Sequence, residues 1–305
     1  LNINAVPIEK LGPMLSGITP ISIVERRERI RRMSGFMKER GIAAVFLDAT
    51  SSLFYFTGIS WSQSERMTAA IITAEGDVAY VTPAFEKERL AEMLLVGKDI
   101  HTWEEHESPY SRVLRILADR GISGGTVGID PYARYFLYDG IRKTAPAGYD
   151  FVNADAVIIP CRLYKSDAEI ALMQRACDIT AEAFKTCISL LKEGMSQTEF
   201  HALSVAAHKA MGVKGAISVQ FGASTAFPHG SKEITRLRKG DVVLMDGGCR
   251  VEGYISDISR TIVFGKPTKR QRDIWELEHR AQAAAFDAAR PGNSCESVDA
   301  AARKV

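Results

Sequence analysis

Hydrophobic and polar positions in the first 160 residues alternate between short apolar runs and amphipathic segments. The spacing of apolar residues predicts helices at 22–41, near 85–95, at 109–120 and near 132–143. Short apolar or aromatic runs predict strands at 42–49, 53–59 and 125–130, and a hairpin at 69–82. Strands alternating with helices indicate a layered α/β domain, which we close at residue 160.

A different pattern follows from residue 161 to residue 305. Three Ser/Thr-x-x-Glu/Gln capping boxes open predicted helices at 165–194, after Ser196 and after Thr268. Between them lie predicted strands at 216–222, 241–249 and 253–265. The pattern is that of an α+β domain. A last helical pattern runs to Val305 without a C-cap, and we therefore expect this domain to be incomplete at its C-terminus.

The amino-acid composition limits the class of protein to which this chain can belong. The chain has 305 residues, 46% hydrophobic and 25% charged, as in an ordinary globular protein of two domains. A net charge of +2 without a basic stripe argues against a nucleic-acid partner. No apolar run approaches the roughly 20 residues of a membrane span, so we expect no membrane partner.

The cysteines bear on the compartment. There are five, an odd number, with no CxxC spacing, which argues against a disulfide framework and a zinc knuckle. Free thiols favour a reducing compartment, so we expect a cytoplasmic protein. The alternative is an exported protein whose signal peptide was removed before Leu1.

Two aspartates occupy positions that read as β-strand, where Asp is disfavoured. Asp246 lies in the predicted strand 241–249, and Asp257 lies in its predicted hairpin partner. If Arg250 faces Gly253, Asp246 faces Asp257, with Cβ atoms about 4.5–5.5 Å apart. A bulge at one of the nearby glycines would shift this register.

Facing carboxylates repel, and three arrangements relieve the repulsion. One acid can be protonated, one can be solvated on a plain structural hairpin, or a cation can lie between them. In hydrolytic sites, two divalent ions about 3.5–4 Å apart serve this purpose. His229, in a loop 17 residues before Asp246, is at a distance that lets the loop fold back over the sheet.

These residues resemble a known family. The segments "PHG", "KGDVVLMDGG" and "GYISDISRT" are similar to those of the pita-bread metallopeptidases, which include Xaa-Pro dipeptidases (prolidases), Xaa-Pro aminopeptidases and the related creatinase. "YKSDAEIALMQRAC" resembles the start of that family's catalytic domain, and "LFYFTG" resembles its amino-terminal domain. The resemblance implies a creatinase-like α/β domain at 1–160 and the first part of a pita-bread domain at 161–305.

The resemblance also implies chemistry. Asp246 would hold one of two divalent ions (manganese, cobalt or zinc), and Asp257 would bridge both. A metal-activated water would attack the Xaa-Pro bond of a proline-containing peptide. His229 would contact the substrate or stabilise the tetrahedral intermediate, and Ser259 would hydrogen-bond the bridging water.

The amino-terminal domain of such enzymes helps to shape the substrate pocket, often that of the neighbouring subunit in a dimer. The resemblance therefore implies a homodimer. It also makes Trp61 and Arg66, in the polar loop "GISWSQSERMT", candidate substrate-binding residues.

The expected ligand set is incomplete in this sequence. The family adds a histidine and two glutamates after the second aspartate. In this sequence the only histidine after Asp257 is His279, which lies in a predicted helix. The glutamates that follow also lie in predicted helices: Glu276, Glu278 and Glu296. We expect weak metal binding and little activity from these residues alone. Two alternatives are a creatinase-like hydrolase of small C–N compounds and a non-catalytic binding module of the same fold.

Overall fold

The computed structural model describes residues 7–227, 230–231 and 233–305. The chain forms two compact units. We name Thr19–Ala171 the α/β unit, and the residues up to Ile18 together with Leu172–Val305 the α+β unit. The sequence boundary at residue 160 falls inside a helix of the α/β unit, α6 (Asp155–Leu163).

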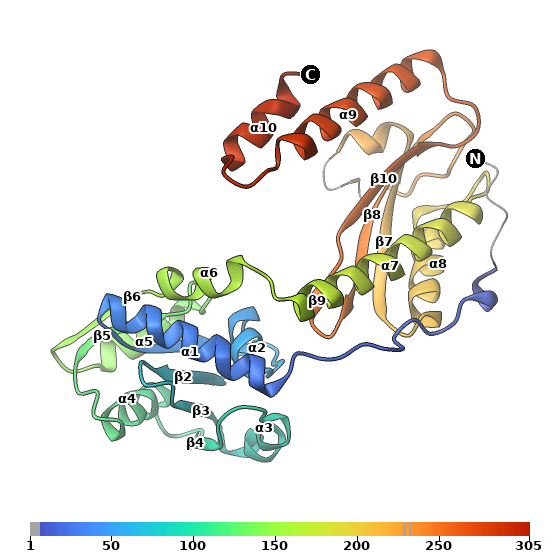
Figure 1. The fold of residues 1–305 in the computed structure, drawn as a ribbon. Coiled ribbons are helices and arrows are strands. Elements are labelled where there is room, and N and C mark those ends of the chain that lie inside the picture. The colour runs from blue at the N-terminus through green and yellow to red at the C-terminus, as the bar shows by residue number, and fades with distance from the viewer. Residues whose placement is uncertain (1–6, 228–229, 232) are drawn as a thin grey trace. The chain divides into compact units, whose positions relative to one another are not determined.

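A six-stranded mixed sheet is the centre of the α/β unit, with strand order β4-β3-β2-β1-β5-β6 (Figure 1). The central strand β1 is antiparallel to β2 and parallel to β5. The strands are β1 (Ile42–Asp48), β2 (Ala69–Thr73), β3 (Val78–Pro83), β4 (Asp99–Trp103), β5 (Gly125–Ile129) and β6 (Tyr149–Asn153).

Helices pack on both faces of this sheet, which gives the layered arrangement that the alternating pattern predicts. One core contains apolar residues of α1, α2, α3 and α6, and the other contains those of α4 and α5. The remaining helices of the unit are α1 (Ile23–Arg40), α2 (Ser51–Thr57), η2 (Ala84–Glu86), α3 (Lys87–Met93), α4 (Pro109–Asp119) and α5 (Tyr135–Thr144).

The prediction of a strand at 53–59 is wrong, because these residues belong to helix α2. The Thr50 side chain caps its start by accepting a hydrogen bond from the Ser52 N–H, and Gly58 ends it with a φ of 88°. Aromatic residues favour strands only weakly, and caps at both ends with burial of Leu53 and Phe56 outweigh that preference here.

The α+β unit contains an antiparallel sheet of four strands, in which β8 pairs with β7, β9 and β10. Helices α7 and α8 run beside it, and α9 packs against α10 (Figure 1). The elements are η1 (Ile8–Lys10), α7 (Asp167–Ser189, which begins in the α/β unit), α8 (Gln197–Ala210), β7 (Lys214–Phe221), η3 (Gly222–Ala226), β8 (Val242–Val251), β9 (Tyr254–Ile255), β10 (Ile258–Val263), α9 (Lys269–Ala288) and α10 (Cys295–Arg303).

Side chains of β8 alternate between the two faces of this sheet. Val243, Met245 and Cys249 are buried, whereas Asp246 and Arg250 are exposed. The buried face is the one that α7 and α8 cover, since the Cys249 thiol lies 3.4 Å from the Ala176 carbonyl oxygen of α7. The exposed positions define the outer face of the sheet.

The hairpin has a different register from the predicted one. Val251 pairs with Tyr254 around a two-residue turn at Glu252 and Gly253, whose φ angles are 47° and 87°. Positive φ at both turn residues matches the tight turn that suits the twist of antiparallel strands. The prediction that Arg250 faces Gly253 was therefore wrong by two residues.

Candidate metal centre

Asp246 lies on the outer face of β8 with a serine directly opposite. In the observed register Asp246 pairs with Ser259 of β10. The Ser259 hydroxyl donates a hydrogen bond to Oδ1 of Asp246 at 2.5 Å. The Ser218 hydroxyl of β7 donates to the Asp246 backbone carbonyl at 2.9 Å. Neither hydroxyl donates a hydrogen bond to Oδ2 of Asp246, and the Asp246 side chain is exposed.

Asp257 does not face Asp246, contrary to the prediction, but reaches the same face by a different geometry. It precedes β10, and its register continues that of Ile258, which pairs with Gly247. Buried Ser256 and exposed Asp257 continue the alternation of the strand. Asp257 is therefore the diagonal neighbour of Asp246, at the roughly 7–8 Å spacing typical of such positions.

Two glycines after Asp246 allow the strands to approach closely. A Cβ atom on Gly248 would lie 1.8 Å from the Ser256 carbonyl oxygen, and one on Gly247 would lie 2.2 Å from that of Ala216. Both distances are far below contact distance, so a side chain at Gly248 would force the hairpin apart, and one at Gly247 would push β8 away from β7. The "DGG" segment thus fixes the position of Asp246 relative to its neighbours.

A buried polar cluster anchors the hairpin from the opposite face, and sequence reasoning missed it. The Ser256 hydroxyl accepts a hydrogen bond from the Cys249 N–H at 3.0 Å and lies 2.7 Å from the Thr180 hydroxyl of α7. All three residues are buried. Because Ser256 precedes Asp257, this cluster holds the backbone from which the second carboxylate projects.

His229 and its neighbour Pro228 lie outside the described residues. The residues that follow them contact the outer face of the sheet. The Ser231 N–H donates to the side-chain oxygen of Gln220 at 3.5 Å, and Gly230 lies against the same side chain. Gln220 is two residues from Ser218 on β7, and Ser218 pairs with Asp246.

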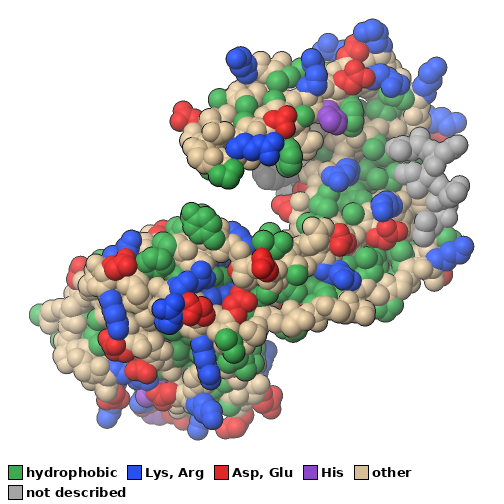
Figure 2. Space-filling view, in the orientation of Figure 1, with side chains coloured by type: hydrophobic (Ala, Val, Ile, Leu, Met, Phe, Trp, Pro, Cys, Tyr) green, Lys and Arg blue, Asp and Glu red, His purple; other side chains and the backbone are tan. Residues whose placement is uncertain are grey.

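The two aspartates could supply part of a binding site for hard divalent cations. Asp246 and Asp257 offer exposed carboxylate oxygens on one face, which suit divalent ions. Among residues 7–227, 230–231 and 233–305, no group of three or more His, Cys, Asp or Glu side chains could hold a metal ion. His279 lies on α9, where its ring centroid is 5.2 Å from that of Trp275 and the two rings are tilted by 57°. Figure 2 shows charged and hydrophobic side chains interspersed on this part of the surface.

Trp61 and Arg66 lie in the α/β unit, in the loop of residues 59–68 between α2 and β2, which we call the α2–β2 loop. Arg89 stacks on the Trp61 ring at 4.8 Å. Arg66 donates to Glu105 at 2.8 Å, and this hydrogen bond raises the pKa of its guanidinium. Their substrate-binding role stays a prediction.

A buried ionic network that the sequence did not reveal lies under this loop. Asp48, at the end of β1, is fully buried and pairs with Arg134 at 2.7 Å. Beside it, Asp130 accepts hydrogen bonds from the Thr50 hydroxyl at 2.5 Å and the Tyr132 N–H at 3.1 Å. Burial raises the pKa of Asp130, although both hydrogen bonds act in the opposite direction.

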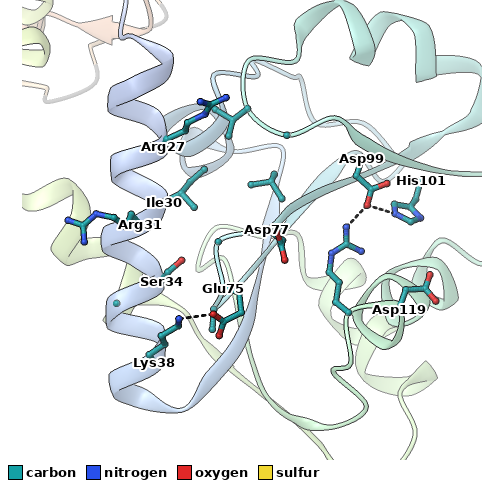
Figure 3. Close-up of a pocket in the computed structure, with 17 residues that line it drawn as sticks. Arg27, Ile30, Arg31, Ser34, Lys38, Glu75, Asp77, Asp99, His101 and Asp119 are labelled. Atoms are coloured by element: carbon teal, nitrogen blue, oxygen red, sulfur yellow. Dashed lines mark hydrogen bonds and ion pairs between the residues drawn. The ribbon is translucent and has the colours of Figure 1, made fainter.

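A groove of about 1000 Å³ in the α/β unit is a poor candidate for a catalytic site (Figure 3). Its charged groups largely neutralise one another. Lys38 pairs with Glu75 at 2.8 Å, and Asp99 binds both Arg120 and His101. Two of its carboxylates, those of Glu75 and Asp99, are thus held by basic side chains, whereas the Asp246 carboxylate takes its hydrogen bond from the neutral Ser259 hydroxyl.

Comparison with known proteins identifies the family. The profile of metallopeptidase family M24 matches residues 171–305, and that of the creatinase/prolidase N-terminal domain matches residues 29–164. An uncharacterized peptidase of Schizosaccharomyces pombe is 33% identical over 315 residues, which cover 96% of this chain and 68% of that protein. The chain belongs to metallopeptidase family M24. It is a peptidase with a creatinase-type N-terminal domain and an M24 pita-bread domain, so the expected family, fold and enzyme class are confirmed.

Relatives that are named for a peptidase activity support the same family assignment. The Xaa-Pro dipeptidase of Pyrococcus furiosus is 28% identical over 292 residues, covering 92% of this chain and 77% of that protein. Dipeptidase PepE from Mycobacterium ulcerans matches with a TM-score of 0.84 at 26% identity, over 94% of this chain and 77% of that one. A prolidase from Thermococcus sibiricus gives a TM-score of 0.82 at 26% identity, over 90% and 76%. Within the described part of the chain, no helix combines the length and apolarity that crossing a membrane requires.

Proposed function

We propose that this M24 peptidase cleaves the Xaa-Pro bond of dipeptides or short peptides, with two divalent ions held in part by Asp246 and Asp257. The observation that carries the proposal is the pair of exposed carboxylates on one face of the β8–β10 hairpin. The names of the relatives, Xaa-Pro dipeptidase and prolidase, supply the substrate class.

The residues of the chain have distinct proposed roles. The Ser259 hydroxyl fixes one oxygen of Asp246 and leaves Oδ2 for a cation. Asp257, one diagonal step away, would help to hold a second ion. Bound ions of this kind lower the pKa of a water and polarise a scissile carbonyl. His229 contacts the substrate in this proposal, which for that residue rests on the resemblance alone.

Further ligands are needed to complete a dinuclear site, because two carboxylates alone bind divalent ions weakly. The resemblance assigns them to a histidine and two glutamates that the described residues do not match. Manganese, cobalt and zinc remain the proposed metals, and a homodimer remains the proposed assembly.

The test measures how fast the full-length protein cleaves different peptide substrates before and after a chelator has removed its metal. We expect cleavage of Xaa-Pro dipeptides or of Xaa-Pro-Yaa peptides to stop and to return when manganese, cobalt or zinc is added. The choice between the two substrates separates dipeptidase from aminopeptidase. Hydrolysis of creatine but of neither peptide would refute the proposal in favour of the creatinase-like alternative.

A further inference from the structure

Two basic side chains face each other on the outer face of the sheet in the α+β unit. Arg250 of β8 pairs with Lys214 of β7, and both residues are exposed. Directly opposite side chains have Cβ atoms about 4.5–5.5 Å apart, and like charges at such positions repel each other. Neither side chain forms an ion pair with the part of the chain that the structure describes. No contact with a described acid therefore relieves their repulsion.

The two bases lie next to the candidate metal centre. Arg250 pairs on its other side with Ile255 of β9, in a register that continues the pairing of Gly247 with Ile258. Asp257 follows Ile255 by two residues on the same face, and it is therefore the diagonal neighbour of Arg250, at roughly 7–8 Å. Since Asp257 is also the diagonal neighbour of Asp246, it lies between the other carboxylate and the bases.

The four charges balance one another on the outer face. Asp246 and Asp257 contribute two negative charges, and Lys214 and Arg250 contribute two positive charges. The other outer-face positions of β7, β8, β9 and β10 hold uncharged residues, and Arg260 has the alternation of the inner face, since it pairs with buried Met245. The bases thus relieve the repulsion between the two carboxylates through space rather than through a contact.

A divalent ion would change this balance. An ion on the Asp257 carboxylate brings two further positive charges to a surface that already has those of Arg250 and Lys214. Coulomb repulsion falls only with the inverse of distance, so the bases act on such an ion from a neighbouring position of the sheet. All four side chains are exposed, and added salt therefore weakens this repulsion.

We propose that Lys214 and Arg250 control metal loading: they act as counter-charges to Asp246 and Asp257 in the metal-free protein, and they lower the affinity of the centre for divalent ions. This inference rests on the metal centre of the proposed function and adds the residues that set its affinity. Its two effects have opposite signs. Removal of a base destabilises the metal-free hairpin but strengthens metal binding, whereas the loss of a purely structural residue weakens both.

The test titrates Mn²⁺ into the full-length protein by calorimetry after a chelator has removed its metal. Arg250→Gln removes the charge next to Asp257 and keeps a polar side chain. We expect the dissociation constant for Mn²⁺ to fall about threefold at an ionic strength of about 10 mM, and to match that of wild type at about 1 M. Hydrogen exchange of the β8 amides in the metal-free variant is expected to accelerate.

Two variants serve as controls. Arg250→Lys keeps the charge and should match wild type in both measurements. Lys185→Gln removes the same charge from α7, which covers the inner face of the sheet, where exposed Lys185 pairs with Glu182 at 3.2 Å. It should change neither measurement. If Arg250→Gln fails to fold, Lys214→Gln provides the same comparison, with a smaller expected effect because Lys214 lies farther from Asp257 than Arg250 does.

The other outcomes overturn definite parts of this account. Unchanged Mn²⁺ affinity in Arg250→Gln at low salt would show that the bases do not act on the metal centre. Weaker Mn²⁺ binding would show that Arg250 supports the hairpin structurally, which also overturns the inference. If the variants bind Mn²⁺ as expected but wild type cleaves no Xaa-Pro peptide, charge control is supported and the proposed peptidase function is refuted.

Discussion

Replacing Ser256 with alanine tests whether the buried cluster supports the hairpin. The substitution leaves the buried Cys249 N–H without its acceptor at 3.0 Å, which costs about 1–3 kcal/mol. The Thr180 hydroxyl loses its hydrogen-bond partner at 2.7 Å and keeps a weak contact with the Cys249 sulfur at 3.4 Å. This loss costs about another 1 kcal/mol of stability. We therefore expect a loss of about 2–4 kcal/mol in the α+β unit.

Hydrogen exchange of the β8 amides measures this loss separately from the α/β unit. The control is Ser218→Ala on the outer face, where water can replace the hydrogen bond to the Asp246 carbonyl, and where we expect less than about 0.5 kcal/mol. If Ser256→Ala and Ser218→Ala reduce protection equally, the buried cluster does not anchor the hairpin and the reasoning is refuted.

Three further predictions concern titration, packing and reactivity. Burial lowers the pKa of His208 below its ordinary value of 6.5, so the unfolded state binds more protons just below that pH and stability falls as the pH drops through this window. Wild type should lose up to about 1.4 kcal/mol per pH unit more than His208→Gln in denaturant unfolding, and equal slopes would contradict this. Gly248→Ala should disrupt the hairpin by a clash with a carbonyl oxygen, whereas Gly12→Ala meets nothing within 4 Å and should unfold as wild type does. Burial raises the pKa of Cys187 to about 12, so at pH 8 iodoacetamide should label exposed Cys295 and spare Cys187 until the protein unfolds; equal labelling rates would count against the burial.

Local patterns predicted much of the fold because caps and periodicity act over short distances. Ser22 and Gly41 delimit α1 as expected, and the capping boxes at Ser196 and Thr268 open α8 and α9. The helix α2 was missed because its aromatic residues read as a strand and its caps are single residues. The domain boundary, the metals and the subunit arrangement stay predictions.

The site was only partly predictable for a geometric reason. Spacing correctly places Asp246 and Asp257 in one hairpin, but the register depends on the turn at Glu252, a non-glycine residue with positive φ. The Asp48–Arg134 pair joins residues 86 apart in the sequence, and no local pattern indicates such a contact. Long-range polar contacts of this kind become visible only in the folded chain.

The central claim is that Asp246 and Asp257 bind the catalytic metal. Metal content and Xaa-Pro cleavage should be measured for wild type, Asp246→Asn and Asp257→Asn in the full-length protein. Glu252→Gln, which removes an exposed carboxylate at the turn of the same hairpin, is the matched control. The account predicts that both aspartate variants lose bound metal and activity while the control keeps them. Retention of metal and cleavage by either aspartate variant would contradict it.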